Sequence, residues 1–105
     1  MSAKVVYNRY FGRFVLSNEG FLLAKSLAPA KSPWKALKSP EDVADAIPRH
    51  DKILVRVVEE LGKNASGYGA SLGIHKLKRR KYRIEIYDGK ETVYEPFQYN
   101  WIEVK

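Results

Sequence analysis

The sequence predicts an α+β domain in which an antiparallel sheet packs against two to three α-helices. Two observations carry this prediction. One segment has the apolar spacing of an α-helix together with residues that start and stop helices, and another has the turn dipeptide and alternation of a β-hairpin. Two predicted strands come first, then helices, then three strands, an order typical of α+β folds with the helices on one face of the sheet. With 105 residues and no linker, the chain is expected to form one domain, 1–105.

The strongest helix signal lies between Asp51 and Gly62. Asp51 can accept hydrogen bonds from the first free amides of a helix, and Gly62 can adopt the left-handed conformation that ends one. The apolar residues between them recur at the spacing of one helical face: Leu54, Val57, Val58 and Leu61. We expect the rest of the chain to pack onto this face.

Residues 81–95 predict a β-hairpin that turns at Asp88-Gly89, a dipeptide typical of the two-residue type I′ turn. This turn pairs Ile84 with Val93 on the face expected to meet the core. A shift of the register by one residue would move Ile84 into solvent, so the pairing is well specified.

The same register pairs Arg83 with Tyr94 on the opposite face, where the guanidinium can lie over the ring. An alternating segment at residues 70–75 predicts a strand just before the hairpin, which would complete a three-strand meander. At the start of the chain, the β-forming residues 4–7 and 13–16 flank a turn-like sequence and predict an N-terminal hairpin.

Two further helices are expected between these strands. Ser17 can cap a helix that runs to Ala28, where the following Pro29 ends it. Ser39 begins a short helix, with proline at its first position and acidic residues in its first turn, that ends before Pro48.

Each of the two tryptophans lies in a segment without a clear periodic pattern. Trp34 belongs to the irregular connection 29–38. It either anchors this connection to the core, as large aromatic residues usually do, or, with lysines on both sides, provides an exposed contact surface. Trp101 is expected to tie the C-terminal segment back onto the sheet.

The composition indicates a basic protein, which either binds an acidic partner or is only kept in solution by its charge. The formal net charge is +7, which favours association with nucleic acid, an acidic protein or a membrane surface. The chain has no cysteine, which excludes disulfides and thiolate chemistry. No apolar run approaches the roughly 18 residues of a membrane span, and no signal-peptide pattern follows Met1, so a non-secreted, intracellular protein is expected.

The charge is densest between residues 76 and 83, where six of the eight residues are basic: Lys76, Lys78, Arg79, Arg80, Lys81 and Arg83. This cluster lies in a connection between predicted strands. It can bind nucleic acid through counterion release, be neutralised by Glu59 and Glu60 of the central helix, or form a solvated turn.

The sequence predicts no catalytic, metal or cofactor site. His50 and Asp51 are neighbours, but adjacent side chains do not face each other on a helix, and no nucleophile is evident. The spacing of His50 and His75 does not suit zinc. The glycine-rich segment 67–69 precedes a predicted strand, whereas phosphate-binding loops of this kind open a helix.

The C-terminal half resembles a small, mostly uncharacterised protein family of bacteriophages and large double-stranded DNA viruses. The residues that carry the resemblance are Arg49, His50, Asp51, Leu54, Val55, Val58, Glu59, Glu60, Leu61, Gly62, Ala65, Ser66, Gly67, Ala70, Leu72, Ile74, Tyr82, Ile84, Tyr87, Asp88, Gly89, Glu91, Val93, Trp101 and Ile102. Family members usually have proline where this chain has Lys52, and a more acidic segment in place of residues 76–81. The resemblance implies a viral origin and does not imply a reaction.

Three functional hypotheses follow. The first is a non-enzymatic virus-encoded binding protein, a minor structural (capsid- or virion-associated) component that contacts other virion or host proteins. The second is a nucleic-acid-binding accessory protein that uses the cluster between Lys76 and Arg83, to which Lys31, Lys35 and Lys38 can contribute. The third is an inhibitor of a host protein. Each hypothesis places the protein in the virion or in the host-cell interior, in the cytoplasm or nucleus.

Overall fold

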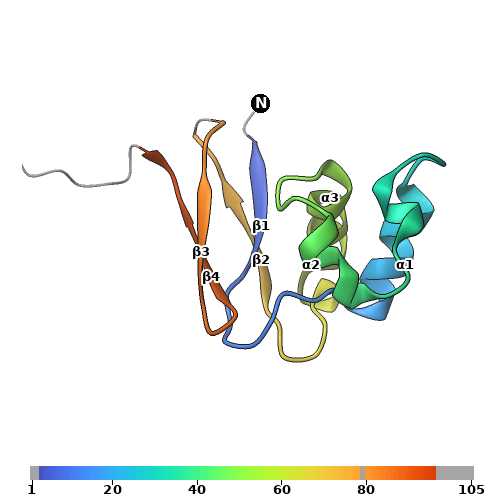
Figure 1. The fold of residues 1–105 in the computed structure, drawn as a ribbon, viewed down its shortest axis with the longest axis horizontal. Helices are drawn as coiled ribbons and strands as arrows, with labels where there is room; N and C mark the ends of the chain where they lie inside the picture. Colours follow the sequence, from blue (N-terminus) through green and yellow to red (C-terminus); the bar gives the residue numbers. More distant parts are fainter. Residues whose placement is uncertain (1–2, 79, 97–105) are drawn as a thin grey trace, which may run out of the picture.

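The computed structural model describes residues 3–78 and 80–96 and confirms the α+β class. Its helices and strands, in chain order, are β1 (Lys4–Asn8), α1 (Asn18–Leu27), the 3-10 segments η1 (Pro33–Ala36) and η2 (Pro40–Asp42), α2 (Val43–Ala46), α3 (Lys52–Leu61), the 3-10 segment η3 (Gly62–Ala65), β2 (Leu72–Lys76), β3 (Arg83–Tyr87) and β4 (Lys90–Tyr94). The β1–β2 pair lies between the β3–β4 hairpin and helix α3, and α1 packs on the far side of α3 (Figure 1).

The described strands form two two-stranded antiparallel sheets rather than one continuous sheet. In the first, β1 pairs with β2, so that Val6 lies opposite Ile74. The prediction of an N-terminal hairpin is therefore wrong, because the partner of β1 comes from the second half of the chain. The prediction of a three-strand meander is wrong for the same reason, since β2 pairs with β1 and not with β3.

Long-range hydrogen bonds explain why residues 9–16 do not fold back onto β1. The segment instead extends towards the turn of the β3–β4 hairpin, where the amide of Gly12 donates to the carbonyl oxygen of Asp88 at 2.9 Å. Further along, Leu16 forms an isolated bridge with Ser66, and the Gly67 amide donates to the Val15 carbonyl oxygen. Contacts with distant segments are therefore formed in place of the local turn that the sequence predicts for this segment.

The β3–β4 hairpin has the predicted turn and register. Ile84 lies opposite Val93, and the two turn residues have positive φ angles of 50° at Asp88 and 86° at Gly89. Val93 is buried, and Ile84 packs against the small apolar cluster to which Val93 belongs. On the other face, the guanidinium carbon of Arg83 lies 5.5 Å from the centre of the Tyr94 ring, as predicted.

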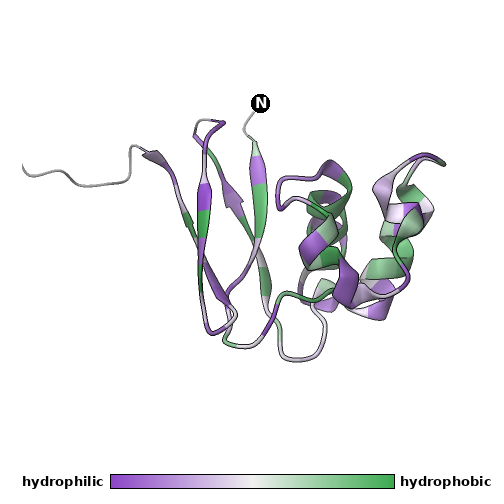
Figure 2. Cartoon of the chain, viewed as in Figure 1, coloured by the Kyte–Doolittle hydropathy of each residue, from purple (hydrophilic) through white to green (hydrophobic). Residues whose placement is uncertain are grey.

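Helix α3 is the centre of the larger apolar core. Its predicted caps are confirmed: the Asp51 carboxylate accepts from the Leu54 amide at 3.0 Å, and Gly62 has a φ of 56°. Leu54, Val57 and Val58 are buried, and Leu61 is half-buried. Figure 2 shows hydrophobic residues in α3 and in the strands beside it, and hydrophilic residues along much of the outer hairpin.

The other predicted helices also form. Helix α1 is capped by Ser17, whose hydroxyl oxygen accepts from the Gly20 amide at 3.0 Å, and it ends before Ala28. The segment after Ser39 begins as η2 and continues as the short helix α2. Ser39 donates its backbone N–H to the Asp42 carboxylate at 3.2 Å, which supports this start.

Trp34 is a core anchor, and its interpretation as an exposed contact surface is wrong. Its side chain is fully buried, and its indole N–H donates to Asp51 Oδ2 at 2.9 Å. The same carboxylate oxygen caps α3, so the connection before α2 and the start of α3 share one acceptor. A buried indole N–H needs a hydrogen-bond partner, and Asp51 supplies it. The other tryptophan, Trp101, lies outside the described residues.

A buried ion pair joins the hairpin to the helical part of the molecule. Glu91 on β4 accepts from Arg49, just before α3, with Oε1 3.2 Å from Nε and Oε2 2.6 Å from Nη2. The Glu91 side chain is 2% exposed and that of Arg49 13%. Arg49 also lies over the Phe14 ring at 3.8 Å and donates to the Ala44 carbonyl oxygen, and Glu91 accepts from the Asn8 amide at 3.1 Å. Every charged group of this pair is therefore hydrogen-bonded.

We expect Gly89→Ala to destabilise the protein more than Gly69→Ala. Both glycines have positive φ angles, 86° and 81°, so either alanine costs on the order of 1–2 kcal/mol in backbone strain. A Cβ atom at Gly89 would also overlap the Gly12 carbonyl, whereas one at Gly69 meets nothing within 4 Å. Equilibrium urea unfolding measures the difference, and equal costs would contradict the close packing of the two turns.

We expect Glu91→Ala to cost about 3–5 kcal/mol of unfolding free energy, because it leaves the Arg49 guanidinium buried without its counter-charge. The double variant Arg49→Met, Glu91→Leu should recover much of this loss, since it leaves no buried charge. Glu60→Ala removes a carboxylate from an exposed pair with Arg56 and should cost at most about 0.5 kcal/mol. Equal losses in the two single variants, measured by denaturant titration, would refute the role of the buried pair.

Candidate nucleic-acid interface

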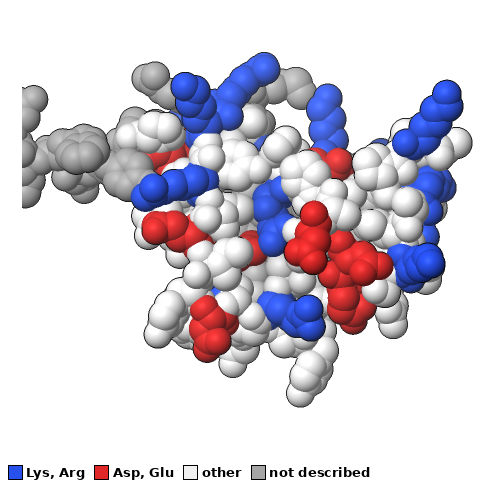
Figure 3. Space-filling view, viewed as in Figure 1, with Lys and Arg blue, Asp and Glu red and all other residues white. Residues whose placement is uncertain are grey.

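Residues 76–83, which run from the last residue of β2 to the first residue of β3, are called the basic turn. Its described basic residues all have exposed side chains: Lys76, Lys78, Arg80, Lys81 and Arg83. Arg79 lies outside the described residues. Figure 3 shows Lys and Arg side chains gathered at the end of the sheets where β2 leads into β3. The structure therefore brings most of the predicted cluster to one end of the molecule.

A buried apolar side chain anchors the backbone of the basic turn to the protein interior. Leu77 is 3% exposed and belongs to the small apolar cluster that includes Val5 and Val93. Its amide donates to the Ala3 carbonyl oxygen at 2.7 Å, which extends the β1–β2 pairing by one bond. The burial of Leu77 between exposed neighbours directs those neighbours outwards.

A buried glutamate provides the second anchor of the basic turn. Glu95 is 1% exposed, and its Oε1 accepts from the Lys78 amide at 2.8 Å. Its Oε2 lies 2.9 Å from Nε2 of His75 on β2. The buried Glu95 carboxylate stabilises the basic segment beside it. Its hydrogen bonds to a backbone amide and an imidazole offset the free-energy cost of burying it.

Sequence reasoning missed Glu91 and Glu95, although a signal was present. Side chains alternate between the two faces of a strand, so residues 91, 93 and 95 share one face. The pairing of Ile84 with Val93 was predicted to face the core, and that prediction places both carboxylates on the core side as well. Two acidic residues on a buried strand face predict buried basic or hydrogen-bonding partners, which are Arg49 for Glu91 and His75 for Glu95.

Among the described residues, the ion pairs of the α3 carboxylates are formed with cations outside the basic turn, which argues against neutralisation of the turn by α3. Glu59 forms an ion pair with Lys4 of β1, and Glu60 pairs with Arg56 at 2.9 Å. Within residues 3–78 and 80–96, the side chains of Lys76, Arg80 and Lys81 form no ion pair. Arg83 lies 3.7 Å from the exposed Glu85 on its own strand.

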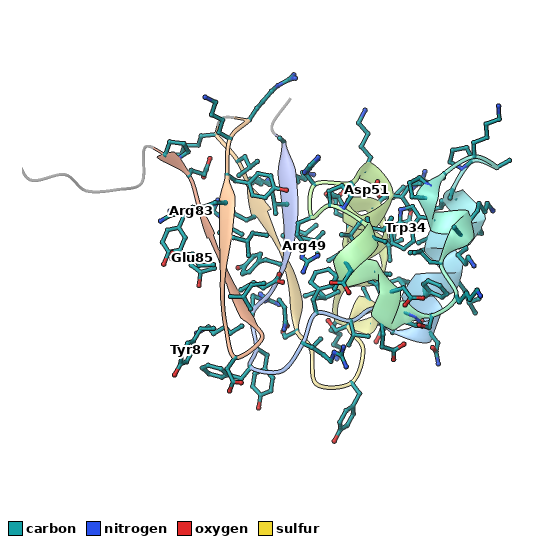
Figure 4. All side chains as sticks on the ribbon, in the orientation of Figure 1. Trp34, Arg49, Asp51, Arg83, Glu85 and Tyr87 are labelled. Carbon is teal, nitrogen blue, oxygen red and sulfur yellow. The ribbon has the colours of Figure 1, made fainter. Side chains whose placement is uncertain are left out.

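The triplet Arg49-His50-Asp51 separates into three unrelated sets of contacts. Arg49 binds Glu91, and Asp51 caps α3 and accepts from Trp34. Figure 4 labels Arg49 on the side of the strands and Asp51 near Trp34 in the helical part. His50 turns to the sheet, with Nδ1 2.7 Å from the Tyr82 hydroxyl. The three side chains therefore do not converge on a common point, and each of them contacts a different element.

Tyr82 is a partly buried phenol within the basic turn. Burial raises its pKa above the usual 10.0, and the positive charge of Arg49 offsets part of this rise. Its ring packs edge-on against that of His50, with the centres 5.8 Å apart. Tyr82 thus links the start of the β3 strand to the residue before the α3 cap.

Two shallow hollows accompany these features. One, of about 350 Å³, lies between β2 and β4 and is lined by Tyr7, Arg9, His75 and Lys90 among others. The second, of about 480 Å³, lies beside the start of α1 and is lined by Arg13, Glu41 and Tyr68 among others. In the described part of the chain, no three His, Asp or Glu side chains come together in a way that could hold a metal ion.

Comparison with known proteins found no match among family models, curated proteins or solved structures. The resemblance to a viral family therefore rests on its motif residues alone and stays a prediction. In the described ranges, every helix is too short or too polar to cross a bilayer.

We expect the Tyr82 hydroxyl to titrate above pH 10.0 in the folded protein. As the pH rises, the phenol therefore ionises first in the unfolded chain. The contribution of Tyr82 to the free energy of unfolding is present below pH 10 and is lost as the pH rises through the pKa of the folded state. Tyr82→Phe should remove this part of the decline, and Tyr68→Phe, at a fully exposed position, should not. Ultraviolet difference titration gives the midpoint, and a value at or below that of an exposed tyrosine would contradict the expectation.

Proposed function

We propose that this chain is a non-enzymatic nucleic-acid-binding protein that contacts phosphate groups through the basic turn. The observation that carries the proposal is the combination of exposed cations with a buried framework beneath them. Leu77 and Glu95 hold the backbone of the turn, and the cationic side chains project from it. A framework of this kind limits the conformational entropy that the turn loses when it binds.

The charge distribution supports an anionic polymer as the partner. Lys76, Arg80 and Lys81 repel one another, and this repulsion is relieved when phosphates are placed among them. Each phosphate neutralised in this way releases condensed counterions, which makes binding favourable at low salt. The pairing of Glu59 with Lys4 and of Glu60 with Arg56 leaves these three cations of the turn for an external partner.

The contacts of Arg49, His50 and Asp51 support binding rather than catalysis. Each of these residues stabilises the fold: one pairs with a buried carboxylate, one contacts Tyr82, and one caps a helix. General acid–base or nucleophilic catalysis needs such groups to converge within hydrogen-bond reach of one another. A role in binding needs only the exposed surfaces at the ends of the sheets.

The hypothesis of a minor virion component stays a prediction that the family resemblance supports. A protein bound to nucleic acid in a viral particle or in an infected cell would combine this hypothesis with the proposed activity. Contacts with other virion or host proteins, and a location in the virion or host-cell interior, belong to the same hypothesis. Mass spectrometry of purified particles tests it, and absence of the chain from the particles would contradict it.

We expect the double variant Arg80→Ala, Lys81→Ala to weaken binding to a DNA duplex. The slope of log affinity against log salt is negative, and its magnitude should fall by about 2, since each lost phosphate contact accounts for about 0.9. Fluorescence anisotropy over a salt series measures both quantities. The matched control is Lys31→Ala, Lys38→Ala, which removes the same charge from the connection near α1, at the other end of the molecule (Figure 1).

The control variant should keep a slope within experimental error of the wild-type slope. Equal effects of the two double variants would mean that net charge alone drives association, which would refute the basic turn as the site. Failure of the wild-type protein to bind any polyanion would refute the proposed function itself.

A further inference from the structure

Aromatic side chains are exposed at the end of the sheets opposite the basic turn. The exposed fractions are 59% for Tyr10, 48% for Phe11, 77% for Tyr87 and 102% for Tyr68. They belong to the loop after β1, the end of β3 at the hairpin turn and the loop before β2, which lie together at one end in Figure 1. This group of four residues is called the aromatic end.

The three loops of the aromatic end are in close contact with one another. The Gly12 amide donates to the Asp88 carbonyl oxygen at 2.9 Å, which joins the first loop to the hairpin turn. A Cβ atom at Gly12 would lie 2.6 Å from the Gly69 carbonyl oxygen, so the loop before β2 passes directly beside it. The buried Asn8 side chain forms two further hydrogen bonds, both at 2.9 Å. Its Nδ2 donates to the Gly89 carbonyl oxygen, and its Oδ1 accepts from the Ser71 amide. The rings are therefore carried on a fixed backbone.

Two of the rings are also held by contacts between side chains. The Phe11 and Tyr87 rings meet edge to face, with centres 6.3 Å apart and planes at 77°. The ammonium group of Lys90 lies 5.4 Å from the centre of the Phe11 ring. Large aromatic side chains are normally buried, and a group of them left in solvent marks a surface that is covered by a partner.

The hollow of about 350 Å³ between β2 and β4 adjoins these rings and is positively charged. Lys90, which contacts Phe11, also lines the hollow, together with Arg9. The Arg9 side chain lies close against Gly73 of β2: a Cβ atom built at this glycine would be 2.8 Å from Arg9 Nε. Glu91 lines the hollow as well, but its carboxylate is paired with Arg49. The acidic residue of the turn, Asp88, is exposed beside Lys90.

We propose that the aromatic end binds single-stranded nucleic acid, with bases stacked on Phe11 and Tyr87 and a phosphate held by Arg9 and Lys90 in the adjoining hollow. Exposed rings beside fixed cations are the arrangement that single-strand-binding surfaces use, because every base has a face that can stack and every nucleotide carries a phosphate. In a duplex the bases are already stacked and paired, so their faces are not accessible. The proposal rests on the proposed function, because it takes nucleic acid as the partner. It adds that the nucleic acid bound at the aromatic end is single-stranded.

The test compares binding of three fluorescent probes to the full chain: a single-stranded DNA oligonucleotide, an abasic strand of the same length, and the corresponding duplex. The wild-type protein should bind the base-bearing strand most tightly. Phe11→Ala and Tyr87→Ala should each weaken that binding by roughly 5- to 150-fold, the effect of about 1–3 kcal/mol per stacked base. Their binding of the abasic strand and of the duplex should match that of the wild-type protein.

Matched variants separate stacking from other causes. Tyr87→Phe keeps the ring and should bind as the wild-type protein does. Leu22→Ala removes an exposed apolar side chain from α1, far from the loops, and should also leave binding unchanged. Thermal melting by circular dichroism checks that the exposed positions tolerate alanine.

Three results would overturn the proposal. The first is equal affinity of the wild-type protein for the base-bearing and abasic strands. The second is binding by Phe11→Ala and Tyr87→Ala that matches Leu22→Ala. The third is a poly-glutamate peptide that binds as tightly as the base-bearing strand and is weakened by the same substitutions, since the partner would then be an acidic protein segment.

The proposed function and this inference fail in different ways. If no polyanion binds the wild-type protein, both fail together. If Arg80→Ala, Lys81→Ala weakens every probe and the ring substitutions weaken none, the proposed function stands and the single-strand surface is refuted.

Discussion

The buried ion pair of Arg49 and Glu91 fixes the β3–β4 hairpin relative to the helical part of the molecule. Most of the β3 strand faces solvent, and the apolar cluster beneath the hairpin is small, so apolar burial alone does little to position it. Arg49 attaches the hairpin to the helical part of the molecule, because its guanidinium bonds to Glu91 in a bidentate manner and lies over the Phe14 ring. Burial of this pair is costly, and full hydrogen bonding of both partners is what makes it tolerable. Both candidate surfaces depend on the hairpin position that results.

The family-like residues around α3 have structural roles that account for their types. Arg49 needs a planar, always charged group with several donors, which lysine does not provide. Asp51 needs a short carboxylate, because a single oxygen serves both the Leu54 amide and the Trp34 indole. These requirements concern the fold, and they turn the neighbouring His50 and Asp51 side chains to different partners. Residues that resemble a reactive set in sequence are separated by the direction in which each side chain leaves the backbone.

The molecule presents two different surfaces at opposite ends of its sheets. One has a high density of positive charge on a turn held by Leu77 and Glu95, and the other has exposed rings beside a cationic hollow. Phosphate contacts contribute affinity without regard to sequence, whereas ring contacts distinguish accessible bases from paired ones. Under the two proposals made above, the basic turn would attract a polyanion and the aromatic end would select its single-stranded form.

The sequence by itself determined the features that depend on neighbouring residues. Helix α3 follows from the spacing of Leu54, Val57 and Val58 and from its two caps, and the hairpin register follows from Asp88-Gly89, because turn chemistry and side-chain alternation act over a few residues. Only the tertiary structure decided the partner of β1, the burial of Trp34 and the pairing of Glu91 and Glu95. It also decided that loops distant in sequence meet at the aromatic end. These outcomes depend on contacts between segments that are far apart in the chain. Such contacts compete with local turns, and a short-range sequence pattern does not predict which of the two will form.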